Sequence, residues 1–353
     1  MTSQNLFFGE QQQLSRSQRW TRALKRRTEW RGATLLAIVS VVALIFEPLI
    51  FGAYGVTLSR VALVGLVAIG LTVVIIMGEL DLSVASTVVL SGVVMAMMPN
   101  LFLGILAALG TGLVVGLVNS FFVVKVGINS FIATLGMLFV LRGLALVLSD
   151  AKPIPLEDVS TAIAFGLPLV GPITPRVILF AIVFALLLVF LTRIRAGREI
   201  YAVGGNRQAA RDAGIPVNRR MITGFVLCSL IAALAGVVDT LERTAADPTS
   251  GTTILLSSIA AAIVGGVALT GGRGTILGTL IGALALSILE VGLTLTGVQV
   301  DIQQIFIGAV LLLAVMTDPA SLRAAGASLR TFLSGLRARG SEPDLTPLNS
   351  TSS

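Results

Sequence analysis

Apolar stretches of roughly membrane-spanning length follow one another along most of this chain, and they constrain its fold more than any other feature. The hydrocarbon core of a bilayer is about 30 Å thick, so a helix of roughly 17 to 25 apolar residues crosses it. Spans are predicted near residues 33–52, 57–78, 84–98, 101–122, 131–149, 177–192, 221–239, 255–271, 275–297 and 302–317. The sequence therefore predicts an all-α integral membrane protein of about ten helices.

The composition excludes an ordinary soluble domain, because 55% of the 353 residues are hydrophobic and only 12% are charged. A net charge of +7 would suggest a nucleic-acid partner for a soluble chain. Here the Arg and Lys residues lie in polar segments beside the apolar spans, as membrane topology requires. We therefore expect a lipid membrane, and no nucleic acid, as the partner of these charges.

Three regions are expected along the chain. Residues 1–32 are polar and basic, residues 33–317 hold the spans, and residues 318–353 end in a Ser-, Thr- and Pro-rich tail that is expected to be partly disordered. The apolar run 33–52 exceeds the roughly 7 to 15 residues of a signal-peptide core, so a retained first span is predicted. The sequence GELDLS precedes the short third span, and it fits either a helix broken inside the membrane or a helix end at the surface.

Basic residues set the predicted orientation. With the N-terminus inside and ten spans, 20 Lys and Arg residues fall on the inner side and four on the outer side. The outer four are Arg60, Lys152, Arg176 and Arg243. Because cytoplasmic segments carry an excess of Lys and Arg, both termini and the segment 193–220 are predicted to be cytoplasmic.

The segment 193–220 carries seven Arg, a Gly-Gly-Asn sequence that predicts a turn, and the signals of one short helix. Asn206 is a good N-cap, and residues 207–213 are mostly helix formers. Gly214 can take the left-handed conformation, and Pro216 prevents the helix from continuing. A helix of about two turns is marginal alone in water, so we expect it to form against a partner.

Side chains for catalysis or metal binding are scarce. The chain has no His and a single Cys, Cys228, which excludes a His-based catalytic triad and an internal disulfide and leaves no clustered zinc ligands. None of Lys25, Lys125 and Lys152 lies in a GK[ST] sequence, so a P-loop for ATP is absent. A non-catalytic protein without metal or cofactor is predicted.

Charges inside predicted spans need a partner or a water-filled cavity, since each costs on the order of 2.5 to 3.5 kcal/mol on insertion scales. Four positions qualify: Glu47, Asp81, Arg142 and Glu290. An ion pair between Asp81 and Arg142 is one hypothesis. In the other, Asp81 or its neighbour Ser83 caps the third span.

Four stretches resemble the transmembrane subunits, or permeases, of bacterial ABC importers of the ribose/xylose/galactose type. They are GELDLSVASTVVLSG from Gly78, INSFIATLGMLFVLRGLAL from Ile128, GREIYAVGGNRQAARDAGIPVNRR from Gly197 and IAAAIVGGVALTGGRGTILGTLIGAL from Ile259. Together they span most of residues 33–317 in the order expected for the family. The chain departs from the family at Glu79, where a Gly is common, and at Ser257 and Ser258, where an acidic residue is often found.

The resemblance implies a type II-importer-like permease fold for residues 33–317 and a coupling loop at 193–220 that docks on a separate ATPase subunit. It also implies a monosaccharide substrate, alternating access across the cytoplasmic membrane, an extracytoplasmic solute-binding protein and a second permease subunit, expected to be identical. The residues expected to couple to the ATPase are Asn206, Arg207, Ala209, Ala210, Arg211, Gly214 and Ile215. Those expected along the translocation path are Asp81, Ser83, Asn119, Ser130 and Thr134, with Arg142 and Glu290 as structural intramembrane charges.

Three further questions stay open at this stage. The outer segment 150–176 holds five Pro and is too long for a tight turn, so it either receives the solute-binding protein or is a passive connector. The substrate is alternatively a nucleoside or a branched-chain amino acid. An ion-coupled secondary transporter, using Asp81, Glu47 or Glu290, is the alternative from another class.

Overall fold

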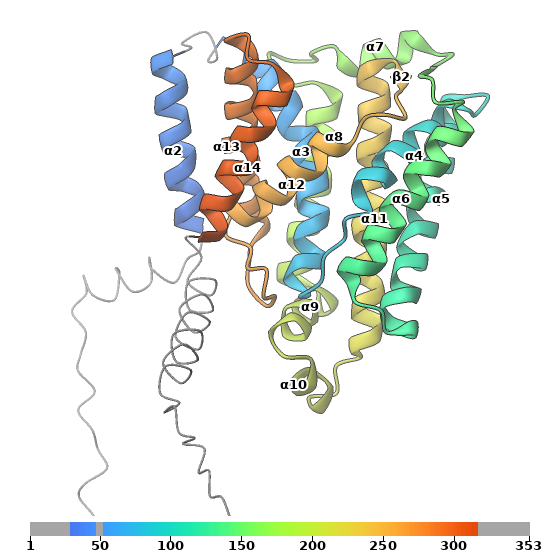
Figure 1. Ribbon diagram of the computed structural model, residues 1–353, viewed down its shortest axis with the longest axis vertical. Coiled ribbons are helices and arrows are strands. Elements are labelled where there is room, and N and C mark those ends of the chain that lie inside the picture. The colour runs from blue at the N-terminus through green and yellow to red at the C-terminus, as the bar shows by residue number, and fades with distance from the viewer. Residues whose placement is uncertain (1–28, 47–51, 317–353) are drawn as a thin grey trace, which may run out of the picture.

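The computed structural model describes residues 29–46 and 52–316, and within them the chain is almost entirely helical (Figure 1). The elements are α2 (Glu29–Phe46), α3 (Tyr54–Ile76), α4 (Val84–Ala96), α5 (Leu101–Ser120), a π-helix (Phe121–Val126), α6 (Ser130–Leu148), β1 (Ile154–Pro155), α7 (Val159–Gly166), α8 (Pro175–Arg193), α9 (Arg195–Gly205), α10 (Arg207–Asp212), α11 (Val217–Arg243), β2 (Ala245–Ala246), α12 (Thr252–Val264), α13 (Ile276–Leu295) and α14 (Val300–Met316).

Six helices in the described part of the chain are long and apolar enough to cross a membrane, and four shorter apolar helices accompany them. The six are Tyr54–Ile76, Leu101–Val126, Ser130–Leu148, Pro175–Arg193, Val217–Arg243 and Ile276–Leu295. The predicted all-α membrane architecture is confirmed, while the number of ten crossings stays a prediction. The predicted span 255–271 is wrong at its end, because α12 stops at Val264 and Gly266 takes a φ of +90° that a helix cannot continue.

The core of the bundle is α3, the helix that is apolar on all sides. Its most apolar window is 94% buried, against 17% for the corresponding window of α6. A helix that is hydrophobic all round is stable only in the middle of a protein or a membrane. Side chains such as Leu66, Ile69 and Ile75 are fully buried between α11, α12 and α13. The apolar side chains that α6 exposes, such as Ile132 and Phe139, fit a lipid-facing surface.

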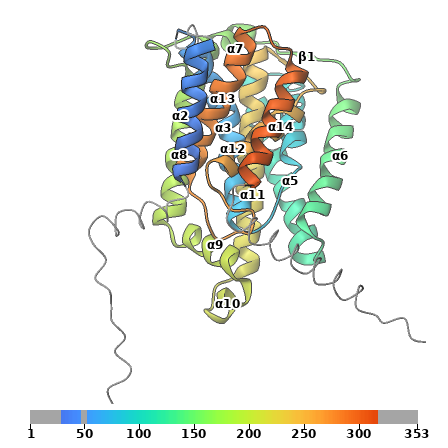
Figure 2. The same cartoon turned by 60° about the vertical axis from the view of Figure 1, so that its left-hand side comes forward.

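The bundle has two different ends (Figures 1 and 2). At one end lie the short helices α9 and α10, and α2 begins and α14 ends there. At the other end lie α7 and the two short strands, which pair antiparallel with Ile154 opposite Ala246. We refer to these as the α10 end and the α7 end. The outer segment 150–176 is thus structured over part of its length, by β1 and α7, rather than an open loop.

Candidate functional site

The short helix predicted in segment 193–220 is present as α10. The Asn206 Oδ1 accepts a hydrogen bond from the Ala209 N–H at 3.0 Å, which is the predicted N-cap. Gly214 has a φ of +76°, and α11 begins directly after Pro216. The predicted short helix, with its N-cap and its left-handed Gly, is therefore confirmed, while its docking role stays a prediction.

The residues predicted to couple to an ATPase are not all on the surface of α10. The side chains of Ala209 and Arg211 are exposed, as is Gly214. Ala210 is buried, with 4% of its surface exposed, because its methyl group faces the rest of the chain. Of the predicted coupling residues within α10, Ala209 and Arg211 therefore lie on its exposed side, together with Gln208 and Asp212, and Ala210 packs against the rest of the chain.

The sequence missed α9, which precedes the docking helix. Gly204 and Gly205, predicted to form a turn, are the last two residues of α9. The prediction was wrong because the amphipathic spacing of the buried residues Glu199, Ile200 and Val203 holds the glycines in the helix. The α9 helix thus lies flat against the bundle and carries α10 at its end.

Glu199 of α9 forms two ion pairs, one within α9 and one with α11. Its Oε1 accepts from the Arg195 Nε at 2.7 Å, and its Oε2 accepts from the Arg220 Nε at 2.5 Å. These hydrogen bonds, that of Arg195 first, hold the pKa of the Glu199 carboxyl below its usual range. The carboxylate is charged at neutral pH and joins the docking segment to a long helix.

Glycines from three distant segments meet beneath α9. A Cβ on Gly204 would collide with the carbonyl oxygen of Ile76 and lie 2.7 Å from the amide nitrogen of Gly272. Those two groups are themselves hydrogen-bonded, with the Gly272 N–H donating to the Ile76 oxygen at 2.7 Å. The end of α3, the end of α9 and the α12–α13 loop therefore touch backbone to backbone, a contact that only residues without side chains permit.

An ion pair joins the docking helix to the end of α3. Arg207, the first residue of α10, donates to the Glu79 Oε1. Glu79 is nearly buried, with 8% of its side chain exposed, and Arg207 is about half exposed. Glu79 is also the position at which the sequence departs from its family's common Gly, so this pair supplies a contact that a Gly could not.

Helix α3 ends at Ile76 and α4 begins at Val84, with an extended segment between them. Buried backbone N–H groups in such a break need partners. The Ser130 Oγ accepts from the Leu80 N–H at 3.2 Å, and the Thr134 Oγ1 accepts from the Leu82 N–H at 3.1 Å. Two hydroxyls one turn apart on α6 thus accept hydrogen bonds from backbone N–H groups of the segment that interrupts the helix.

Asp81 accepts further hydrogen bonds within the same break. Its Oδ1 accepts from the Ser83 N–H at 2.9 Å and from the Ser83 Oγ at 2.6 Å. The Asn119 Nδ2 donates to the Ser83 Oγ at 2.8 Å and lies 3.4 Å from the second Asp81 oxygen. The structure therefore brings together the five residues predicted along the path, Asp81, Ser83, Asn119, Ser130 and Thr134, around the extended segment.

The predicted ion pair between Asp81 and Arg142 is wrong. Asp81 is fully buried and turns its carboxylate to Ser83 and Asn119, whereas Arg142 is exposed on α6. The capping hypothesis is met only in part: the Asp81 Oδ1 accepts from the N–H of Ser83, the residue before α4, but neither side chain makes the usual cap hydrogen bond to the first turn of that helix. Glu47, the remaining predicted intramembrane charge, lies outside the described residues.

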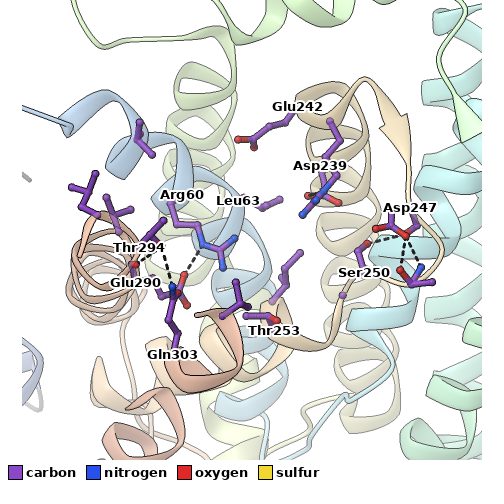
Figure 3. Close-up of a pocket in the computed structure, with 18 of the residues that line it drawn as sticks. Arg60, Leu63, Asp239, Glu242, Asp247, Ser250, Thr253, Glu290, Thr294 and Gln303 are labelled. Atoms are coloured by element: carbon purple, nitrogen blue, oxygen red, sulfur yellow. Dashed lines mark hydrogen bonds and ion pairs between the residues drawn. The ribbon is translucent and has the colours of Figure 1, made fainter. Parts of the chain in front are cut away.

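A polar cavity of about 650 Å³ opens between α3, α11, α13 and α14 towards the α7 end (Figure 3). The five residues around the break do not line it. Charged and amide side chains converge on it from four helices and the loop after β2: Arg60, Asp239, Glu242, Arg243, Asp247, Glu290 and Gln303. No predicted site residue other than Glu290 lies among them.

Glu290 and Arg60 form the deepest ion pair of this cavity. The Arg60 Nε lies 2.5 Å from the Glu290 Oε2, and the Ser257 Oγ donates to the other carboxylate oxygen. Arg60, predicted on the outer side, lies in the first two turns of α3. The sequence held a signal for this pair, because a charge within an apolar run, such as Arg60, needs a partner of opposite sign or a water-filled cavity. Ser257, at a position where the family often has an acidic residue, donates its hydroxyl hydrogen bond to this carboxylate.

The rim of the cavity carries two more ion pairs. The Arg243 Nε lies 3.0 Å from the Asp239 Oδ1, and the Arg176 Nη1 lies 2.7 Å from the Glu242 Oε1. The second pair joins α8 to α11 close to α7. In the described ranges no cluster of His, Cys, Asp and Glu could hold a metal ion. The cavity therefore offers hydrogen-bond donors and acceptors to a neutral polar molecule.

Residues 54–315 match the family model described as branched-chain amino acid transport system / permease component. The ribose import permease protein RbsC of Escherichia coli (strain K12) is 40% identical over 270 residues, which are 74% of this chain and 84% of that protein. The same protein of Bacillus subtilis (strain 168) is 37% identical over 270 residues, 74% and 83% of the two chains.

The L-arabinose ABC transporter permease protein AraH of Azospirillum brasilense is 38% identical over 268 residues, which are 74% of this chain and 78% of that protein. No solved structure gives a significant match. Each of these relatives carries a sugar in its name, and the matched residues cover nearly all the described helices.

Proposed function

This chain belongs to the family of branched-chain amino acid transport system permease components, and on that premise we propose that it is the transmembrane subunit of an ATP-binding cassette importer for a monosaccharide. It acts as a multi-pass protein of the cytoplasmic membrane. The chain supplies the passage, and a separate ATPase subunit supplies the free energy.

The observation that carries the proposal is the α10 junction. A capped helix of six residues is too short to be stable alone, yet it lies at one end of the bundle next to α9, whose inner face is buried against the bundle. Its exposed Ala209 and Arg211 face away from the chain, while Arg207 and Gly204 connect it to α3. Such a helix suits a docking element that a second protein pushes or pulls.

The charge distribution supports a cytoplasmic α10 end. Segment 193–220 alone holds seven Arg, and α2 begins and α14 ends at the same end of the bundle. We infer that both termini are cytoplasmic, that ten helices cross the membrane, and that the α7 end faces outward. The ordered α7 and β1 then form the surface on which a solute-binding protein delivers the substrate. A second, identical chain would complete the path.

Alternating access follows from the same contacts. Movement of α10 would be transmitted through Glu79 to the extended segment between α3 and α4 and, through Gly204, to the α12–α13 loop. These are the segments that end or interrupt membrane helices, so small shifts there tilt α4 and α13. Asp81, Ser83, Asn119, Ser130 and Thr134 remain proposed path residues that come into play when this segment moves.

We favour a monosaccharide over a branched-chain amino acid as the substrate. The hydroxyl groups of a sugar match the carboxylates, guanidinium groups and Gln303 amide of the cavity, and its C–H faces can pack on apolar lining residues such as Leu63 and Val291. The names of the ribose and arabinose relatives support the same choice. Against ion coupling, Asp81 and Glu290 are both held by neighbours within the chain.

A pull-down from detergent-solubilised membranes tests the proposal, with a tagged ATPase subunit from the same organism as bait. We expect the unaltered chain to co-purify and Ala209→Asp with Arg211→Glu to be lost, since both changes lie on the exposed face of α10. Arg219→Gln, an exposed change in the first turn of α11, is the control and should bind as the unaltered chain does. Failure of every ATPase to bind the unaltered chain would contradict the proposal.

A further inference from the structure

Arg142 is a charge inside an apolar helix that the rest of the chain does not neutralise. It lies on α6, six residues before the end of the helix at Leu148, which is about 9 Å along the axis at 1.5 Å per residue. Its side chain is exposed and makes no hydrogen bond or ion pair with any described residue. In the described parts of the six long apolar helices, the other unpaired cations, Lys125, Arg193 and Arg219, all lie in terminal turns.

Such a position is costly unless water reaches it. A guanidinium at the centre of a membrane helix costs on the order of 2.5 to 3.5 kcal/mol on insertion scales, and an unpaired one is found facing a water-filled cavity or a partner. The other membrane charges of this chain follow that rule, as the pair of Arg60 and Glu290 does. Arg142 therefore marks a surface of α6 that lipid does not cover.

The neighbours of Arg142 show which way this surface faces. Arg142 borders a small pocket of about 70 Å³ together with Ser86 of α4 and Ser250 and Gly251 before α12. Ser250 and Gly251 also line the large polar cavity. The guanidinium and the cavity thus both border the turn that holds Ser250 and Gly251. Asp247 stabilises this turn by accepting a hydrogen bond from the Thr249 N–H at 2.9 Å.

We propose that Arg142 lies on the substrate path, next after the polar cavity, and donates hydrogen bonds to the hydroxyls of a passing polyol. This inference rests on the proposed function. A guanidinium carries five N–H donors and stays charged at all working pH values, so it can hold two adjacent hydroxyls without a protonation step. The small pocket is far smaller than a sugar, so the polyol would pass along the exposed side of Arg142.

Cysteine accessibility tests this placement without relying on transport. Cys228 is the single cysteine of the chain and is buried, so Cys228→Ser gives a background free of thiols. Arg142→Cys, Ser250→Cys and Val140→Cys are then treated from outside with a membrane-impermeant methanethiosulfonate in the assembled complex. Val140 is 54% exposed on the apolar face of the same helix and is the matched control.

We expect Arg142→Cys and Ser250→Cys to react at least about tenfold faster than Val140→Cys, because the reagent attacks thiolates, which form in water and not in lipid. Ser250→Cys leaves Arg142 in place, so it reports on the path in a chain with the native charge. An Arg142→Cys no more reactive than Val140→Cys would show that lipid or a second chain covers the position, and would overturn the proposal.

Uptake of radiolabelled D-ribose and D-xylose gives a second readout. Arg142→Lys, which keeps a charge and three donors, should retain uptake within about threefold, and Arg142→Leu should lose at least about tenfold. Equal uptake by Arg142→Leu and the unaltered chain would overturn the proposal. Co-purification of the ATPase is measured on the same samples, so its loss in the unaltered chain would indicate failure of the importer assignment rather than of this site.

Discussion

Arg207, at the start of α10, forms an ion pair with Glu79, which precedes it by 128 residues and lies in the extended segment between α3 and α4. Glu79 is nearly buried and Arg207 is half exposed. The pair therefore ties a surface helix to the interior of the bundle. It gives a physical route by which a protein docked on α10 can move the break in a membrane helix.

Removing the two members of this pair should have unequal effects. Arg207→Gln leaves a nearly buried carboxylate without its partner and should lower the free energy of unfolding by about 1–2 kcal/mol, while Glu79→Gln should cost less than about 1 kcal/mol. Both should lower sugar uptake about three- to tenfold in vesicles containing the whole complex. The charge exchange Glu79→Arg with Arg207→Glu should recover part of the uptake, and no recovery would argue against a direct coupling role.

Two adjacent glycines of α9 offer a matched pair of substitutions. Gly204→Ala places a methyl group against the backbone of Ile76 and Gly272, which cannot yield as a side chain can, so α9 must shift. We expect Gly204→Ala to lower the midpoint of thermal unfolding by several degrees and to reduce uptake. Gly205→Ala meets nothing within 4 Å and should leave both close to the unaltered values. Equal behaviour of the two variants would contradict the close contact.

The pair of Arg60 and Glu290 should behave as a buried ion pair. Arg60→Met leaves Glu290, which is 4% exposed, with only Ser257 as partner, and should destabilise the chain by about 2–4 kcal/mol. The double variant Arg60→Met with Glu290→Met should recover most of that loss, because neither member of the pair is then left as a buried charge without its partner. Thermal unfolding in detergent distinguishes the two, and a double variant as unstable as Arg60→Met would refute the pairing.

The ion pairs of Glu199 should contribute to the stability of the fold at neutral pH and lose that contribution in acid. Arg195 and Arg220 hold its folded-state pKa below the unfolded value of about 4.3, so its contribution is fully present above that value and is lost as the pH falls through the folded pKa. Glu199→Gln should lower the unfolding midpoint by roughly 2–5 °C at pH 7, and the difference should shrink below about pH 4. Glu157→Gln, at an exposed carboxylate, should show no such difference; a gap that persists at low pH would indicate lost packing instead.

Much of the architecture could be predicted because its causes are local. Apolar length predicted the helices, and the Asn206 cap with Gly214 predicted α10, since each signal acts within a few residues. Where local signals conflicted the prediction failed. Gly204 and Gly205 favoured a turn, but packing of Ile200 and Val203 on the bundle kept them helical.

The site was predictable only in part. Sequence identified Asp81, Ser83, Asn119, Ser130 and Thr134 as polar residues of interest, but their common contact with the break in a helix depends on α4, α5 and α6 meeting there. The partner assigned to Asp81 was wrong because a charge in a span has several candidate partners, and only the rotation of α6 decides that Arg142 points elsewhere.

By itself, the sequence determined an all-α membrane protein with an Arg-rich segment that holds a short capped helix, because hydrophobic length and capping are properties of neighbouring residues. Only the tertiary structure decided that Glu79 pairs with Arg207, that Arg60 pairs with Glu290 across 230 residues, and that three glycine-bearing segments meet under α9. Contacts between distant segments depend on how helices rotate and pack against one another, and no local pattern records that choice.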